Sequence, residues 1–413
     1  MFVLVALGSR GDVQPMASLA NALTSSGHEA SIVALADYES LAARLAPAAH
    51  FVPVPATIDD ALDRSRFQDL LAQFMPGQYL LLKQWVSQLA ESFAAALLAT
   101  VGPADTVVTG ALTRGATMAC VAGLGCKLAT MVYTGQLPTL RRESFIAPQY
   151  FTGWEPYDRW GARLSWELST SLGNALTTAV RRRLGLPHKG FRALTRLADE
   201  HPIILAASPL LIPTAPDWPA TTRQTGYLPP PAMPFDLAPE LRDFLRRRPV
   251  FIGFGSFTQF TMERDTEAIL AAAESTGRPV LTLARPGLAA GPVTREVFAI
   301  DHAPFDRLFT EVAATIHHGG AGTSHEAIRS GRPTAVIPFG VDQPLHAQRL
   351  HALGLGPSPG RLGRHGLEPG ELARLIDALT GPESDRYAER AHRISRMARA
   401  ERGLEQTLRV LTH

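Results

Sequence analysis

Short runs rich in valine, isoleucine and leucine recur along the chain, and segments with helical periodicity or turn signals separate them. The runs fall into two sets, which are divided by a proline-rich stretch, residues 214–240, with almost no periodic pattern. Strands that alternate with helices form parallel sheets, because each crossover helix returns the chain to the same edge of the sheet. The alternation therefore predicts two α/β domains, each built on a parallel sheet.

The length of the chain, 413 residues, also favours two domains, because it exceeds what one hydrophobic core usually supports. We expect a first Rossmann-like domain in residues 1–210, a linker in 211–240 and a second Rossmann-like domain in 241–390. The tail is charged and helix-prone, and its apolar residues are too sparse for a separate core. It predicts a C-terminal helix, residues 391–413, that packs back on the first domain.

Composition excludes several classes of protein. The chain is 46% hydrophobic and 19% charged, as is typical of a soluble globular protein, and its formal net charge of +2 gives no reason to expect a nucleic-acid partner. Two arginine runs, residues 181–183 and 246–248, could bind phosphate or a membrane surface. We interpret both as solvated helix ends, which is the commoner origin of isolated triplets.

Cys120 and Cys126 lie in an apolar segment without CxxC spacing or a nearby histidine pair. This pattern favours buried, reduced thiols over a disulfide or a zinc site. The apolar opening MFVLVALG lacks a basic n-region, so it predicts a strand rather than a signal peptide. Other apolar stretches are interrupted before they reach membrane-spanning length. We therefore expect a cytoplasmic protein without stable membrane insertion.

A glycine-rich turn, His318–Ser324, follows a predicted strand and opens a helical segment that ends at Gly331. Such a turn presents unpaired backbone N–H groups at the positive end of the helix dipole, which suits a phosphate or diphosphate. Thr323 and Ser324 can add hydroxyl donors. A tight turn that needs glycine for steric reasons alone is the alternative, but a nearby acid and an Asp-Gln pair after the next strand favour binding.

A second polar turn, Gly8–Pro15, follows the first predicted strand. It lacks the G-x-G-x-x-G pattern, which argues against a dinucleotide site. Asp12 has two interpretations that the residues alone leave open. It could be a carboxylate base that takes a proton from a hydroxyl group, or a capping residue at the start of the helix that follows.

Together these motifs resemble glycosyltransferase family 1, the GT-B enzymes, especially the bacterial antibiotic-modifying and sterol-glucosylating branches. The resemblance implies two Rossmann-like domains whose parallel sheets face each other across a cleft. It further implies an inverting enzyme that moves a hexose or deoxyhexose from a UDP or dTDP sugar to a hydroxyl of a hydrophobic acceptor. We rank a polyketide or macrolide-type natural product first as the acceptor.

The resemblance also implies roles for individual residues. Asp12 falls on the position of the catalytic base, and Ser9 and Arg10 beside it could reach the diphosphate. The predicted donor contacts are His318, Gly320, Gly322 and Thr323 with the diphosphate, Ser256 near the phosphates, Glu326 with the ribose, Asp342 and Gln343 with the sugar, and His302 and Ala303 with the base. The family acts without a bound metal, and the chain has no DxD motif, so we expect no metal and no other cofactor.

Several polar residues receive a structural interpretation instead. Asp37 is expected in a solvated loop, and His317 behind His318 at a strand end. His325, His346 and His351 are expected on helix surfaces.

Aromatic and apolar residues between Phe67 and Trp166 could line a hydrophobic acceptor pocket, although a core helix or lid contact explains any one of them equally well. A sterol or lipid glycosyltransferase is the alternative within the same class. A nucleotide-sugar 2-epimerase and a non-catalytic nucleotide-sugar-binding protein are the alternatives from other classes. UDP and dTDP sugars are equally compatible with the Asp-Gln pair.

Overall fold

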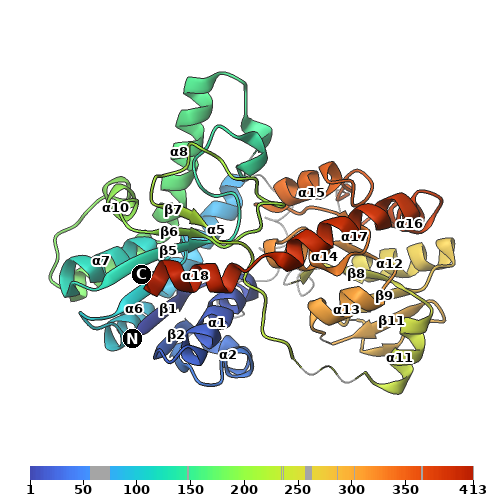
Figure 1. Cartoon of the computed structure of the whole chain (residues 1–413), viewed down its shortest axis with the longest axis horizontal. Coiled ribbons are helices and arrows are strands. Elements are labelled where there is room, and N and C mark those ends of the chain that lie inside the picture. Colours follow the sequence, from blue (N-terminus) through green and yellow to red (C-terminus); the bar gives the residue numbers. More distant parts are fainter. Residues whose placement is uncertain are drawn as a thin grey trace. The chain divides into compact units, whose positions relative to one another are not determined.

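The two predicted sets of strands form two separate sheets in the computed structural model of the chain (Figure 1). The structure describes residues 1–55, 75–146, 148–233, 235, 237–255, 263–285, 287–301, 303–363 and 366–412. The chain divides into unit 1, residues 1–231 and 402–413, and unit 2, residues 232–401. Each unit is an α/β domain of Rossmann-like type, so the predicted fold class is confirmed.

Unit 1 contains a seven-stranded parallel sheet with the order β3-β2-β1-β4-β5-β6-β7. Its strands are β1 (Phe2–Ala6), β2 (Ala30–Leu35), β3 (His50–Val54), β4 (Thr106–Thr109), β5 (Lys127–Val132), β6 (Ile203–Leu205) and β7 (Thr222–Gln224). β1 is buried along its whole length, which explains why its sequence is continuously apolar. β7 was not predicted, because this short edge strand is polar and its residues are not buried.

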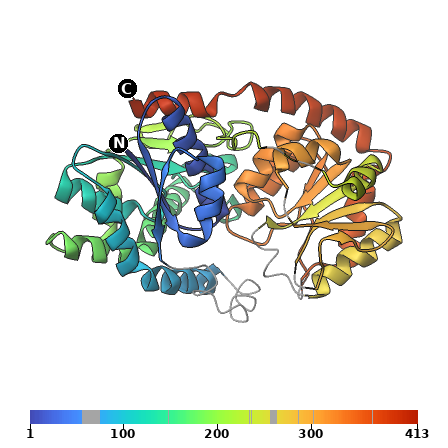
Figure 2. The same cartoon turned by 90° about the horizontal axis from the view of Figure 1, so that it is seen from below.

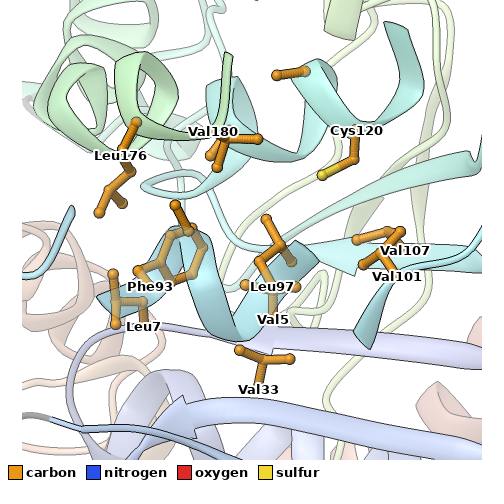
Figure 3. Close-up of a cluster of buried hydrophobic side chains, with 14 of the residues drawn as sticks. Val5, Leu7, Val33, Phe93, Leu97, Val101, Val107, Cys120, Leu176 and Val180 are labelled. Carbon is orange, nitrogen blue, oxygen red and sulfur yellow. The ribbon is translucent and has the colours of Figure 1, made fainter. Parts of the chain in front are cut away.

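The helices of unit 1 pack on both sides of this sheet. They are α1 (Arg10–Ser25), α2 (Glu39–Leu45), α5 (Met75–Gln88), α6 (Ala90–Thr100), α7 (Arg114–Leu124), α8 (Glu155–Leu172), α9 (Asn174–Arg183), α10 (Phe191–Ala198) and α18 (Gly403–Thr412). Figure 3 shows part of the core, in which Phe93 and Leu97 of α6 lie among Val33 of β2 and Leu176 and Val180 of α9. All five side chains are fully buried.

Unit 2 contains a six-stranded sheet with the order β10-β11-β9-β8-β12-β13. Its strands are β8 (Val250–Gly253), β9 (Val280–Leu283), β10 (Gly291–Pro292), β11 (Val297–Ile300), β12 (Ala314–His317) and β13 (Thr334–Val336). The short edge strand β10 pairs antiparallel with β11, and the other pairs are parallel.

Helices cover both faces of the second sheet. They are α11 (Pro239–Arg246), α12 (Glu263–Thr276), α13 (Phe305–Glu311), α14 (Ala321–Ser330), α15 (Gln343–Ala352), α16 (Pro369–Thr380) and α17 (Ser384–Ala400). Val250 and Ile252 of β8 pack with α12 and α16, whereas Phe251 between them packs with α11 and α13. This alternation follows from the two-residue period of a strand, and it buries the sheet on both faces.

The unit boundaries differ from the predicted parts. Residues 211–231, predicted as linker, belong to unit 1, where Leu211 is fully buried. The predicted linker was too long at its start, because proline and polar residues interrupt the periodic pattern there although the chain still packs on the core.

The predicted C-terminal helix, residues 391–413, is likewise two helices. α17 belongs to unit 2, and the backbone becomes extended at Glu401 before α18 begins in unit 1. There α18 contacts α1 (Figure 2), and Thr407 Oγ1 donates a hydrogen bond of 2.8 Å to Thr225 Oγ1.

Cys120 and Cys126 are free and buried, as predicted. Burial raises the pKa of Cys120 to about 12, so this thiol stays protonated at neutral pH. Among the described helices, none combines the length with the hydropathy that a membrane span requires.

Candidate functional site

The glycine-rich turn lies in unit 2, where the parallel strands β12 and β13 end. The carboxyl ends of such strands are the usual place for a ligand in an open α/β sheet. β12 ends at His317, the turn runs through His318, Gly319 and Gly320, and α14 begins at Ala321. Buried side chains hold this turn in place, and the sequence predicted the positions of only some of them.

Two buried histidines form hydrogen bonds with the backbone of Gly319. Its N–H donates to His317 Nδ1 at 3.0 Å, and its carbonyl oxygen accepts from His346 Nδ1 at 2.7 Å. Since His317 Nδ1 is an acceptor, its proton lies on Nε2, which donates to Thr334 Oγ1 at 3.0 Å. Burial holds the pKa of His317 well below its usual range, so the ring is neutral as this arrangement requires.

Position 319 also requires a residue without a side chain. Its φ is +89°, and a Cβ atom there would lie 2.8 Å from Val336 Cγ1. The turn therefore depends on glycine at this position for both backbone conformation and space.

His318 lies between two glycines. A Cβ atom on Gly255 would lie 2.7 Å from His318 Cε1, and one on Gly320 would lie 2.4 Å from His318 Nε2. Burial, with the nearby His346 as a smaller cause, lowers the pKa of His318 to about 4. At neutral pH the ring is uncharged, so it can offer a phosphate a hydrogen bond but no positive charge.

The first turn of α14 has no side-chain cap. Gly320 is the N-cap residue, and Ala321, Gly322 and Thr323 are partly exposed. The position of a Cβ atom on Gly322 has no heavy atom within 4 Å. Backbone N–H groups at an uncapped helix start are suited to an anion. Ser324 was predicted as a further donor; its side chain is fully buried, and this role stays a prediction.

Glu326 lies on the same helix, and its side chain is buried with Oε2 4.0 Å from Arg329 Nε. Its ribose role stays a prediction. Asp342 is the N-cap residue of α15 and is partly exposed. The chain enters it through Val341, an exposed residue with φ of +55°, a conformation that β-branched residues rarely adopt.

Gln343 is buried, and its Oε1 accepts from the backbone N–H groups of Phe339 at 2.6 Å and Gly340 at 3.2 Å. The amide oxygen thus holds the loop that precedes Asp342. Its predicted contact with a donor sugar remains a prediction, and the Nε2 donors are the atoms left for that contact.

In unit 1, the polar turn forms a capping box at the start of α1. Ser9 Oγ accepts from Gly11 N at 3.2 Å, while Asp12 Oδ2 accepts from Ser9 N at 2.8 Å and from Ser9 Oγ at 3.2 Å. Gly8 makes this approach possible, because a Cβ atom there would lie 2.3 Å from Asp12 Oδ2. Asp12 therefore has a capping role, but as the N3 residue of the capping box, because the helix begins two residues earlier and Ser9 is its N-cap. This role does not conflict with a second role as a base.

Two tyrosines and an arginine lie near Asp12, whose role as a base stays a prediction. Burial, followed by the charge of Asp12, raises the pKa of Tyr133 and of Tyr38, so both phenols stay protonated. Tyr133 Oη lies 3.5 Å from the Asp12 carbonyl oxygen. Arg10 is exposed, and its Nε donates to Gln14 Oε1 at 3.2 Å.

Two family descriptions match the chain, one in each unit. Residues 2–119 match the glycosyltransferase family 28 N-terminal domain, and residues 271–402 match the C-terminal domain of erythromycin biosynthesis protein CIII-like proteins. An O-mycaminosyltylonolide 6-deoxyallosyltransferase of Streptomyces fradiae is 28% identical over 417 residues, which cover 97% of this chain and 94% of that protein. With its two Rossmann-like units and these matches, the chain is a glycosyltransferase of the GT-B fold.

Two further proteins resemble this glycosyltransferase. A sterol 3-beta-glucosyltransferase of Arabidopsis thaliana is 32% identical over 203 residues, but these cover 48% of this chain and only 31% of the plant enzyme. The crystal structure of the glycosyltransferase VinC in complex with dTDP has a TM-score of 0.63 and 20% identity, and covers 100% of this chain and 98% of that chain. That likeness supports the fold, and the relatives show that the chain is a sugar-transferring enzyme.

Some predicted site residues of the glycosyltransferase lie outside the described part of the chain. These are Ser256 and His302, together with Phe67 at the start of the predicted acceptor region. Ala303, which follows β11, is described and is buried in the core of unit 2. Its proposed contact with the nucleotide base would have to come from its backbone.

Sequence reasoning misplaced two histidines of the glycosyltransferase. His325 and His346 were predicted on helix surfaces, but both are buried, and only His351 is exposed. Gln343, His346, Ala347 and Leu350 share one buried face of α15 with a three-and-four residue spacing. That spacing could have predicted the buried face of the helix. The prediction missed it because histidine and glutamine are polar and were not counted as core residues.

The remaining structural interpretations of polar residues are mostly correct. Asp37 is exposed, and His317 lies behind His318 at the end of β12. Arg182 and Arg183 pair with Glu91, but Arg181 is buried and donates to the Pro187 carbonyl oxygen, so that run is only partly a solvated helix end. Within the described ranges, no group of three or more histidines, cysteines, aspartates and glutamates is arranged to hold a metal ion.

Proposed function

We propose that the enzyme is an inverting glycosyltransferase that uses a UDP or dTDP sugar and a hydrophobic alcohol. The observation that carries this proposal is the uncapped start of α14, presented by a turn that His317 and His346 hold in place. The amide groups of this turn would bind the diphosphate, with hydrogen bonds from His318 and Thr323. They would also stabilise the negative charge that grows on the leaving diphosphate.

Asp12 is proposed as the base. The acceptor oxygen attacks the anomeric carbon from the face opposite the diphosphate, and its proton passes to the Asp12 carboxylate. The bond between the anomeric carbon and the diphosphate oxygen breaks, and the diphosphate leaves with the electron pair. The proposal includes no metal ion, since the α14 amides and neighbouring side chains supply donors to the leaving group.

The acceptor is proposed to be a natural product of the polyketide or macrolide type. The full-length similarity to an enzyme named for O-mycaminosyltylonolide supports this class. A sterol is the second candidate, because the similarity to the plant sterol glucosyltransferase reaches 32% identity over about half of this chain. The two free, buried cysteines are compatible with a reducing compartment, so a cytoplasmic location is part of the proposal.

A transfer assay tests the proposed function. The protein is incubated with UDP-glucose and a set of dTDP-deoxysugars against a macrolide aglycone and a sterol, and products are read by mass shift. A hexosyl or deoxyhexosyl mass increase is expected on the macrolide. Conversion of the donor without any acceptor would indicate a 2-epimerase instead. Tight nucleotide binding without any product would indicate a non-catalytic protein.

Replacing Asp12 with Asn tests the base. Asparagine can still accept the capping hydrogen bonds, so α1 should form normally, and nucleotide affinity should stay within about twofold. Transfer should fall at least about 100-fold, because the amide cannot take a proton. The measurement is kcat beside nucleotide affinity by calorimetry. Retained turnover, or an equal loss of nucleotide binding, would contradict the assignment.

A further inference from the structure

A cavity of about 330 Å³ opens in unit 2 at the edge of the sheet where the strands begin. Val250 starts β8, and Pro279, Ala313 and Pro333 directly precede β9, β12 and β13. It therefore lies at the opposite end of these strands from the glycine-rich turn. Four arginines and one aspartate are among its lining residues, namely Arg247, Arg248, Arg278, Arg332 and Asp385. We call it the arginine cavity.

The four arginines differ in how their guanidinium groups are occupied. Arg247 pairs with Glu296, and Arg332 donates to the Thr310 carbonyl oxygen. The Nε atom of Arg332 is buried and has no hydrogen-bond partner among the described residues. The guanidinium groups of Arg248 and Arg278 likewise make no hydrogen bond or ion pair within the described part of the chain. Arg248 and Arg278 therefore have donors available at this cavity, and Arg332 adds a third positive charge beside them.

Holding these positive charges close together costs electrostatic free energy. Burial, and after it the charge of Arg248, lowers the pKa of Arg332. Arg248 also has φ of +55°, a conformation that glycine or asparagine adopts more easily than arginine. Its neighbour in the predicted run of residues 246–248, Arg246, is a solvated helix-end residue paired with Asp243. Arg248 instead follows the helix in a strained conformation beside a like charge.

Helix ends contribute to the potential at this edge. α11, α12 and α14 end here, and the partial negative charge of their C-termini offsets some of the repulsion between the arginines. α17, a helix of 17 residues, starts here with Ser384 and Asp385 on the cavity. Asp385 is the one acidic lining residue, so the charge on the cavity wall is predominantly positive.

We propose that the arginine cavity is a second anion site, which binds a small phosphorylated molecule through Arg248, Arg278 and Arg332. Guanidinium groups recognise phosphate oxygens through paired N–H donors, and the cavity volume accommodates a phosphate or diphosphate group with part of the molecule that carries it. The site is separate from the proposed donor site, and the inference does not depend on the proposed function.

Calorimetric titration of the full chain with inorganic pyrophosphate tests the proposal. The titration is performed in phosphate-free buffer with saturating UDP or dTDP, so that the proposed donor site is occupied. Pyrophosphate is expected to bind in the presence of the nucleotide, with an affinity that falls as salt is added. Parallel titrations with orthophosphate and with a hexose phosphate distinguish a free anion from a phosphorylated metabolite as the ligand.

The double variant R248A/R278A should weaken pyrophosphate binding at least about tenfold. The matched control is R242A/R307A, which removes the same charge from α11 and α13 away from the cavity lining and should change the affinity less than about threefold. Circular dichroism establishes that both variants fold. Equal affinity in the cavity and control variants, or complete displacement of pyrophosphate by the nucleotide, would overturn the proposal.

Discussion

At the scale of single residues, His346 is the side chain that sequence reasoning most undervalued. It is fully buried, and its Nδ1 donates to the Gly319 carbonyl oxygen at 2.7 Å. This bond fixes the turn from which the α14 amides are presented. In the proposed function, His346 would therefore act on a bound diphosphate through the backbone, as a positioning residue.

Replacing His346 with Ala should weaken nucleotide binding. The change leaves the buried Gly319 carbonyl without its donor, which should cost about 1 to 3 kcal/mol of stability. Nucleotide affinity should fall about tenfold, measured by calorimetry with UDP and dTDP. His351→Ala is the matched control, because His351 lies on the same helix but is exposed. Equal affinities of the two variants would refute the positioning role.

At the scale of secondary-structure elements, a buried ion network joins α7 and α8 to the end of α10. Arg114 is fully buried, and its Nη2 donates to Asp199 Oδ1 at 2.6 Å. Arg163 Nη1 and Trp166 Nε1 of α8 also donate to this carboxylate, at 2.7 and 3.1 Å. The carboxylate of Asp199 thus connects residues that are 36 and 85 positions away in the sequence.

Replacing Asp199 with Ala should destabilise unit 1 strongly. It removes the counter-charge of buried Arg114, a change that typically costs about 3 to 5 kcal/mol. The measurement is the thermal unfolding midpoint. Asp243→Ala removes an equivalent ion pair with Arg246, but both partners are exposed, so its midpoint should hardly change. A similarly small shift for Asp199→Ala would show that the network contributes little.

The elements themselves were largely predictable. The strands β1, β2 and β12 are buried along their whole length because both faces of each sheet are covered, and in β1 this is readable in the sequence as a continuous apolar run. The capping box at Ser9 and Asp12 is also a local pattern. In contrast, β7 and the buried face of α15 depend on packing partners that are distant in the sequence, and local polarity concealed them.

At the scale of the whole molecule, the buried histidines link stability to pH. Burial lowers the pKa of His318 to about 4 and that of His325 to about 3, from an ordinary value of 6.5. The unfolded chain therefore binds protons at these residues below pH 6.5 while the folded chain does not. Stability is fully present above pH 6.5 and decreases as the pH falls toward 4.

We therefore expect the thermal midpoint of unit 2 to fall when the pH is lowered from about 7 to about 5. Carboxylates also titrate toward the lower end of this range, so variants are needed to isolate the histidines. His325→Asn should make the midpoint less dependent on pH, because it removes a buried histidine whose pKa is lowered to about 3. Identical pH profiles of wild type and His325→Asn would contradict this assignment.

Local patterns in the sequence are enough to predict the two α/β domains and the two turns that carry the family resemblance, because hydrophobic period and turn chemistry are local properties. Only the tertiary contacts show that residues 211–231 and α18 belong to unit 1, that His346 and Gln343 hold backbone groups, and that four arginines from three helix ends line one cavity. These features arise from burial and from contacts between distant segments, and such contacts leave no periodic pattern in the chain.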